Sequence, residues 1–339
     1  LGPYAAWKGS KPRYTTLLRK EDADFLRQSA RQTWEYFAVH MSPDRNDLPP
    51  DNVQVEPRRP VAERTSPTNI GMGLLAPYAA FCLQLIGEEE MLSRTQATLS
   101  TVERMEKWNG HLYNWYDTQS LAVLRPRFVS TVDSGNLAAS LFALREALLG
   151  FADGRAETLA KRVDALLSAM DFSTLYDRER KLFYIGFDAQ SGEMNGAHYD
   201  LLASEARLTS FCAIAKGDVE GEHWFRLARP LTVMEGNRLL ISWSGTMFEY
   251  LMPVLFTGLA GETLLDESVR GAVAAQRAAG KGKPWGISES GYYAFDLNMN
   301  YQYRAFGLPG MGVKPAREDW VIAPYATALA AMIDPGGAA

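Results

Sequence analysis

The sequence predicts an all-α fold, an (α/α) barrel with long functional loops and a small β-hairpin. Helical periodicity recurs along the chain, whereas strand-like runs are scarce and no alternation of strands with helices indicates a parallel sheet. Nine helical segments joined by long, aromatic-rich connections can pair and close into a ring. Because no linker or low-complexity segment divides the chain, we expect residues 1–339 to form a single domain.

The first helix is expected at residues 21–41, where large apolar side chains recur at helical spacing behind acids that favour a helix N-terminus. The clearest strand signal is TLYDRERKLFYIGFD (174–188), in which two short apolar runs flank a charged turn and predict a hairpin. The other expected helices show the same periodicity, several after a Ser, Thr or Asn cap: 69–87, 89–107, 134–150, 155–169, 199–216, 245–258, 263–279 and 322–333.

Composition limits the classes of protein to which the chain can belong. It has 339 residues, of which 47% are hydrophobic, enough to bury a large core. The net charge of −5, without any block of like charges, argues against a nucleic-acid partner. Four scattered histidines show no ligand spacing, so we expect no metal site. Cys82 and Cys212 lie in apolar helical runs and are expected to be free, buried thiols.

The ends of the chain suggest a piece of a larger protein. The sequence begins with Leu1 rather than Met, and its start has no basic-then-apolar signal. Its apolar stretches are shorter than the roughly 20 residues that a membrane helix needs. We therefore expect an excised soluble domain.

The residues that can carry chemistry are carboxylates placed beside aromatic side chains. Motifs for a Ser-His-Asp triad, a GxSxG nucleophile and a Walker-type phosphate loop are missing. Glycoside cleavage uses two carboxyl groups that flank the bond, and aromatic faces hold sugar rings. The sequence therefore favours a sugar-processing site built from loops at one end of the ring.

Three glutamates are candidates for a catalytic role. Glu205 lies beside an apolar helical stripe, so it either points into a cleft or pairs on the surface with a base such as Arg207. Glu249 sits between apolar residues, where burying an unpaired acid is costly, so it either braces a neighbouring loop or takes part in catalysis. Glu289 follows a tryptophan in an irregular segment flanked by Gly and Ser, which favours a catalytic acid.

Further acids and aromatic rings cluster in four separate loops. The acids either accept hydrogen bonds from sugar hydroxyls or brace loops through Asx turns, and the rings either face a sugar or pack in the core. Their clustering favours the sugar-binding alternative. The substrate-binding candidates are Trp115, Asp117, Asp133, Trp243, Trp285, Asp296 and Tyr303.

Ten motifs, in chain order, closely resemble the glucan-cyclising domain of cyclic β-1,2-glucan synthases. They extend from about residue 20 to 333, and their order makes them far more specific than any one alone. The second half is also similar to a wider glycoamylase-like group that includes endo-β-1,2-glucanases. The motifs are LPPDNVQ, TSPTNIGMGLLA, GHLYNWYDT, STVDSGNLAASL, YDLLASEARLTSFCAIAKGDV, HWFRLAR, ISWSGTMFEYLMP, PWGISES, YQYRAFGLPGMGVK and VIAPYATALA.

The resemblance implies an (α/α)6 barrel and retaining transglycosylation of linear β-1,2-glucan into rings, without a metal or organic cofactor. The glutamate of ASEARL, Glu205, matches the family's acid/base, and that of WGISES, Glu289, matches its nucleophile. Tyr292 and Tyr293 depart from the family, whose members more often have a small residue and an asparagine there. The resemblance also implies a bacterial source and a place on the cytoplasmic side of the inner membrane, among the other domains of a synthase. A standalone periplasmic enzyme is the alternative.

Two other functions remain open at this point. An inverting endo-β-1,2-glucanase would use the same barrel and acid, with water activated by a different carboxylate. A non-catalytic glucan-binding module would keep the aromatic rings and tolerate the loss of both glutamates. The presence of Glu205 and Glu289 weighs against the binding module.

The stretch from Trp285 to Gly310 is expected to be non-helical at its start and to cross the mouth of the barrel. Glu289 would then point inward, and Asp296, Tyr301 and Tyr303 would brace it through hydrogen bonds. A nucleophile on a loop needs such support, because it must be held within about half an ångström of its productive position.

Overall fold

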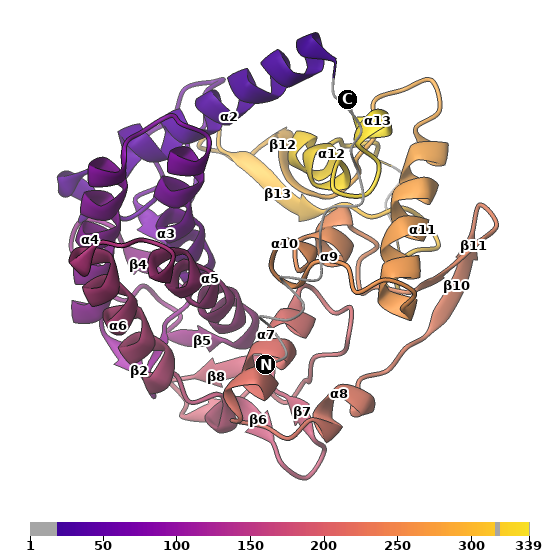
Figure 1. Ribbon diagram of the computed structural model, residues 1–339. Coiled ribbons are helices and arrows are strands. Elements are labelled where there is room, and N and C mark those ends of the chain that lie inside the picture. Colours follow the sequence, from indigo (N-terminus) through magenta and orange to yellow (C-terminus); the bar gives the residue numbers. More distant parts are fainter. Residues whose placement is uncertain (1–18, 316–318, 339) are drawn as a thin grey trace.

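The computed structural model describes residues 19–315 and 319–338, and its helices form a ring (Figure 1). The helices of the first half are α2 (Lys20–His40), α3 (Pro67–Cys82), α4 (Glu88–Arg104), α5 (Thr131–Leu149), α6 (Gly154–Ala169) and α7 (Ala206–Lys216), with 3-10 turns at Pro43–Arg45 and Phe172–Leu175. Helix α3 packs against α4 and α5 packs against α6, each pair joined by a short turn, and most of the long elements are helices, which confirms the predicted all-α barrel.

The second half of the ring has shorter helices and longer connections. Of the helices described there, α11 is the one long helix, and the break between α9 and α10 falls at Pro253. The helices are α8 (Glu222–Arg226), α9 (Met247–Leu251), α10 (Val254–Thr257), α11 (Leu264–Ala279), α12 (Pro324–Ala330) and α13 (Pro335–Ala338).

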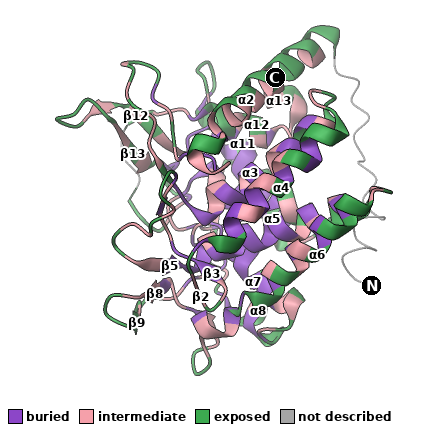
Figure 2. Cartoon of the chain, turned by 90° about the vertical axis from the view of Figure 1, so that its left-hand side faces the viewer, coloured by how far each residue is buried: buried purple, intermediate pink, exposed green. Residues whose placement is uncertain are grey.

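The strands form small antiparallel sheets, most of which lie at one end of the helices (Figure 2). The predicted hairpin at 174–188 is present, with Tyr176 opposite Phe183. The pairs are β1 (Arg64–Thr65) with β4 (Tyr116–Asp117), β2 (Lys107–Trp108) with β3 (His111–Leu112), β6 (Tyr176–Asp177) with β7 (Leu182–Phe183), β10 (Leu231–Met234) with β11 (Asn237–Leu240) and β12 (Glu289–Phe295) with β13 (Tyr301–Ala305), while β5 (Phe128–Ser130), β8 (Gly186–Asp188) and β9 (Glu193–Met194) form one sheet.

Helix α5 has more buried residues than any other described helix (Figure 2), because α3, α6 and α7 all pack against it. The unbroken buried run at residues 134–141 faces every direction, as expected for a helical segment that is enclosed on all sides. Gly135 allows α7 to approach closely, because a Cβ atom there would come within 1.9 Å of Thr209 Oγ1. This contact brings the start of α5 next to the start of α7, where Glu205 lies.

Several sequence predictions are corrected by the structure. The segment 199–205 is not helical, so the helix expected at 199–216 begins only at Ala206. The expected helix at 245–258 is split into α9 and α10, and the hairpins β10–β11 and β12–β13 were not foreseen. Both cysteines are free, but Cys82 is exposed at the end of α3, so only Cys212 is a buried thiol.

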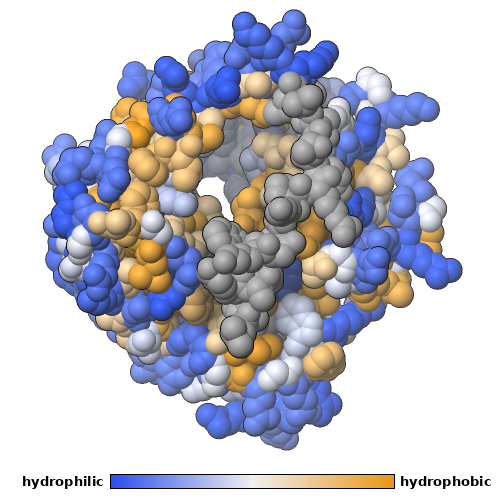
Figure 3. Space-filling view, viewed as in Figure 1, coloured by the Kyte–Doolittle hydropathy of each residue, from blue (hydrophilic) through white to orange (hydrophobic). Residues whose placement is uncertain are grey.

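The ring is hollowed at its centre, and apolar residues border the part of the hollow that is visible in Figure 3. Among the described residues, no helix is both long and apolar enough to span a membrane.

Candidate active site

Glu205 occupies the N-cap position of α7, and its carboxyl group is buried. Asn136 Nδ2 donates a hydrogen bond to Glu205 Oε1 at 2.6 Å, and the Ser204 hydroxyl donates to Oε2. Loss of contact with water raises the pKa of Glu205, and the nearby charge of Asp133 raises it further. Arg207 instead donates to the main-chain carbonyls of residues 249 and 250, so the surface ion pair considered from the sequence is not formed.

A chain of hydrogen bonds connects Glu205 to Asp133. Thr68 Oγ1 donates to Asp133 Oδ1 at 2.6 Å, and Asn136 Nδ2 donates to both Thr68 Oγ1 (3.0 Å) and Glu205. Removal from water raises the pKa of Asp133 as well. The structure therefore places two acids in a poorly hydrated region where no cation of the described residues is hydrogen-bonded to either, which favours the protonated form of Glu205.

Glu289 begins strand β12 and is half-buried. Desolvation raises its pKa to about 7, and the carboxylates of Glu205 and Glu249 also act to raise it. Two groups act in the opposite direction, because the Tyr303 hydroxyl donates to Glu289 Oε2 and the Lys314 ammonium attracts its charge. Both glutamates accept hydrogen bonds from neutral donors, but the Lys314 charge lowers the pKa of Glu289. The Asp133 charge instead raises the pKa of Glu205, so Glu289 is the better suited of the two to be ionised.

The carboxyl groups of Glu205 and Glu289 lie in one site, although the residues are far apart in sequence. The charge of Glu205 raises the pKa of Glu289, and both charges raise the pKa values of Tyr303 and Tyr325. The Tyr325 hydroxyl donates to the main-chain carbonyl of Glu289 at 2.9 Å and pairs with the Ser288 hydroxyl. Two tyrosines thus hold Glu289, the first residue of β12, through its side chain and its main chain.

Glu249 is fully buried and braces two loops. Its carboxylate accepts hydrogen bonds from the backbone N–H groups of Ser204, Ser244 and Thr246, and from Ser242 Oγ at 2.8 Å. With Thr246 it also forms a capping box at the start of α9. All of these contacts are structural, so the loop-bracing alternative fits Glu249.

Trp243 and Trp115 lie near the acids, each with a cation on its face. Lys314 Nζ lies 4.4 Å from the centre of the Trp243 ring. The same ammonium group lowers the pKa of Glu289, so Lys314 interacts with both the ring and the carboxylate. The Arg64 guanidinium lies 4.5 Å from the centre of the Trp115 ring. When the amide O and N atoms of Asn114 are exchanged, its nitrogen donates to Asp133 Oδ2 and its oxygen accepts from Trp115 Nε1, both at 3.1 Å.

The remaining substrate-binding candidates have mainly local contacts. Asp117 Oδ1 accepts hydrogen bonds from the backbone of 119 and 120 and from the Ser120 hydroxyl, which is a loop-bracing Asx turn. Trp285 packs against the apolar core of the second half of the ring. These contacts correspond to the structural alternatives that were considered for the two residues.

The expected bracing of Glu289 is only partly present. Tyr303 does bond to Glu289, but Asp296 accepts instead from the backbone N–H groups of Asn298 and Asn300, inside the turn of its own hairpin. The Tyr301 hydroxyl donates to the main-chain carbonyl of Glu56. Asp296 and Tyr301 therefore shape the hairpin, and the prediction that they bond to Glu289 is wrong.

Sequence reasoning missed Asn136, Thr68, Lys314 and Tyr325. All four lie within the motifs quoted above, but their roles depend on contacts between distant segments. Among the described residues, no group of three or more His, Cys, Asp and Glu side chains could hold a metal ion.

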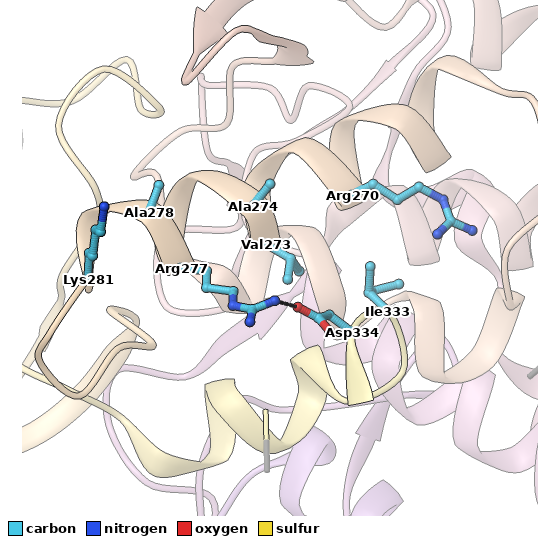
Figure 4. Close-up of a pocket in the computed structure, with 8 residues that line it drawn as sticks. All are labelled: Arg270, Val273, Ala274, Arg277, Ala278, Lys281, Ile333 and Asp334. Carbon is cyan, nitrogen blue, oxygen red and sulfur yellow. Dashed lines mark hydrogen bonds and ion pairs between the residues drawn. The ribbon is translucent and has the colours of Figure 1, made fainter. Parts of the chain in front are cut away.

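A hollow of about 440 Å³ lies away from these acids, between α11 and the turn before α13 (Figure 4). Apolar side chains such as Val273 and Ile333 line it, and Arg277 pairs with Asp334 across it at 2.5 Å. None of the candidate site residues lines this hollow.

Comparison with known proteins supports the resemblance. No family model matches the chain. Over an aligned length of 466 residues it is 34% identical to the cyclic β-(1,2)-glucan synthase NdvB of Rhizobium meliloti (strain 1021). The chain is homologous to one segment of this synthase. The alignment covers 99% of the chain but 16% of the synthase, so the chain spans about a sixth of its curated relative.

Solved structures confirm the fold class. A putative glucoamylase from Bacteroides caccae ATCC 43185 matches with a TM-score of 0.76 and 18% identity, over 94% of this chain and 81% of that one. An endo-β-1,2-glucanase from Chitinophaga pinensis, solved with sophorotriose and glucose, matches with a TM-score of 0.75 and 17% identity, over 93% and 80% of the two chains. The resemblance stated from the sequence and the (α/α) barrel are thereby confirmed.

Proposed function

We propose that this chain is a retaining transglycosylase that acts on linear β-1,2-glucan and closes it into cyclic β-1,2-glucan. The observation that carries the proposal is a pair of glutamates in one site with opposite surroundings. Glu205 is buried among neutral donors and beside Asp133, whereas Glu289 has a tyrosine donor and the Lys314 charge. Such a difference separates the roles of acid and nucleophile.

In the first step, the Glu289 carboxylate attacks the anomeric carbon while the glycosidic C–O bond breaks. Glu205 gives its proton to the departing glucosyl oxygen, so an ester between Glu289 and the glucan forms and Glu205 becomes charged. In the second step, Glu205 takes the proton from an incoming hydroxyl group, which displaces Glu289. If that hydroxyl belongs to the far end of the same glucan, a ring is released; if it belongs to water, the product is a shorter linear chain.

The rival function is an inverting endo-β-1,2-glucanase, and the shared fold with the Chitinophaga pinensis enzyme is the observation that favours it. Incubation with linear β-1,2-glucan, with mass analysis and early NMR of the products, decides between the two. We expect rings that are one water lighter than the linear chains, and β-anomers among any newly formed ends. Linear products with α-anomeric ends would overturn the proposal, and glucans with β-1,3 or β-1,4 links serve as controls.

The relative is a bacterial protein, which points to a bacterial source for the chain. We propose that the domain works on the cytoplasmic side of the inner membrane, joined to the other domains of a synthase. The small share of the synthase that the chain matches supports only the presence of further domains, because the rest of such a protein is available for them.

Tyr303→Phe is expected to move the acidic limb of the pH–kcat/KM profile to higher pH. Glu289 must be ionised to attack, so kcat/KM in the wild type should rise with pH until about 7, the pKa of Glu289. The Tyr303 hydrogen bond lowers that pKa, so its removal raises it. A profile measured between pH 4 and 9 checks this shift. An unmoved limb in Tyr303→Phe would show that another group sets the profile.

A further inference from the structure

The hairpin β12–β13 has two different faces. Residues directly opposite each other in an antiparallel pair point to the same side, and neighbours along a strand alternate. Glu289 opposes Ala305 and Gly291 opposes Tyr303, so these residues share the face of the candidate nucleophile. Tyr292 points to the other side, where its ring packs on Phe306 with centroids 5.0 Å apart.

Beyond a bulge between Tyr292 and Phe295, aromatic rings continue the Glu289 face toward the hairpin tip. Phe295 opposes Tyr301, and their ring centroids lie 5.3 Å apart. Tyr293 contacts both, with centroids 4.6 Å from Phe295 and 6.0 Å from Tyr301. Strand geometry makes the row from Glu289 to Phe295 on the order of 20 Å long.

The outermost ring of this row, Tyr293, faces solvent. The Tyr293 side chain is 75% exposed, and the hairpin projects from the end of the ring that carries most of the strands (Figure 2). The opposite face of the hairpin already holds it to the core through Tyr292. Tyr293 therefore contributes little to packing in the free protein, while Phe295 and Tyr301 are half-buried beside it, and the outer surface of this cluster is available to a ligand.

The hairpin is also fixed in place across the barrel mouth. Gln54 donates to the main-chain carbonyl of Met299 at 2.9 Å and accepts from the Tyr301 N–H at 2.8 Å. The Tyr301 hydroxyl donates to the Glu56 carbonyl, and Asp296 closes the turn. A surface held this firmly loses little entropy on binding.

We propose that Tyr293, Phe295 and Tyr301 form an aromatic platform that binds glucosyl units of the glucan chain several residues away from the bond that reacts. The platform continues the same face of the strand that presents Glu289, so one chain can lie on both. Its rings are uncharged, which suits a neutral polysaccharide whose sugar rings have apolar faces. The substrate class named here rests on the proposed function.

The test is Tyr293→Ala in the full chain, assayed with long linear β-1,2-glucan and with the shortest oligosaccharide that the wild type converts. We expect kcat/KM to fall about tenfold on the long glucan, because one lost ring contact has that effect, and less than twofold on the short substrate. Tyr293→Phe keeps the ring and should behave as the wild type. Phe225→Ala removes an equally exposed ring, on α8, and is the matched control.

A second experiment measures the binding affinity of the same glucan for the inactive Glu289→Gln variant, with and without the added Tyr293→Ala change. It tests the platform independently of whether the proposed function is correct. Weaker binding in the double variant supports the platform even if the wild type fails to convert β-1,2-glucan. Equal binding, together with equal kcat/KM at every chain length, overturns the platform while the proposed function stands. If Tyr293→Ala instead only dissociates a dimer, the rings are an interface between copies of the chain and the proposal is wrong.

Discussion

Glu289→Gln is expected to lower kcat on β-1,2-glucan by about 10⁴-fold or more, and Glu205→Gln by about 10²- to 10⁴-fold. The first change removes the nucleophile, and no neighbouring group can form the glycosyl ester in its place. The second removes a proton donor, so the leaving oxygen must depart as an alkoxide. Both replacements keep the shape of the side chain, so the folded structure should persist. Steady-state rates on purified protein, with circular dichroism as a check of folding, measure the effect.

The control for this pair is Glu193→Gln, which changes an exposed carboxylate on β9 and should leave kcat unchanged. Near-normal turnover in either Glu205→Gln or Glu289→Gln would exclude that residue from the chemistry.

A second measurable effect of Glu289→Gln is on thermal stability. Because the pKa of Glu289 is raised in the folded state, its charge destabilises the fold as the pH rises through about 7, so Glu289→Gln should raise the melting temperature more at pH 9 than at pH 5.

Glu249→Ala is expected to destabilise the fold by about 3–5 kcal/mol, the largest loss of stability expected from a single change here. The variant leaves the buried N–H group of Thr246 and the part-buried N–H groups of Ser204 and Ser244 without an acceptor, and it removes the capping box. Urea unfolding curves measure this loss. Glu249→Gln keeps part of the hydrogen bonding and should cost less. A loss within about 1 kcal/mol for Glu249→Ala would show that water replaces the carboxylate readily.

Much of the ring can be predicted from the sequence because long helices have a local signal. The periodic apolar stripes of α2, α4 and α11 lie close to their expected bounds. The stretch before Glu205 has the same periodicity but is not helical, since Ser204 adopts a φ of 54° and Glu249 holds its N–H group from another loop. Tertiary contacts of this kind override local propensity.

The candidate site was only partly predictable, for the same reason. Glu205 and Glu289 could be paired through the family resemblance, whereas periodicity and composition contain no signal that brings them together. The roles of Asn136 and Lys314 depend on hydrogen bonds and charges between remote segments. The error on Asp296 was avoidable, because an Asp followed by Asn298 and Asn300 is typical of a turn that the Asp itself caps.

The most direct test of the account is azide rescue of Glu289→Ala on linear β-1,2-glucan. With the nucleophile removed and Glu205 intact, azide can enter from the side that Glu289 left free, while Glu205 still protonates the leaving oxygen. The account predicts restored cleavage and an α-glucosyl azide product, identified by NMR. No rescue by azide, together with release of α-anomeric ends by the wild type, would contradict it.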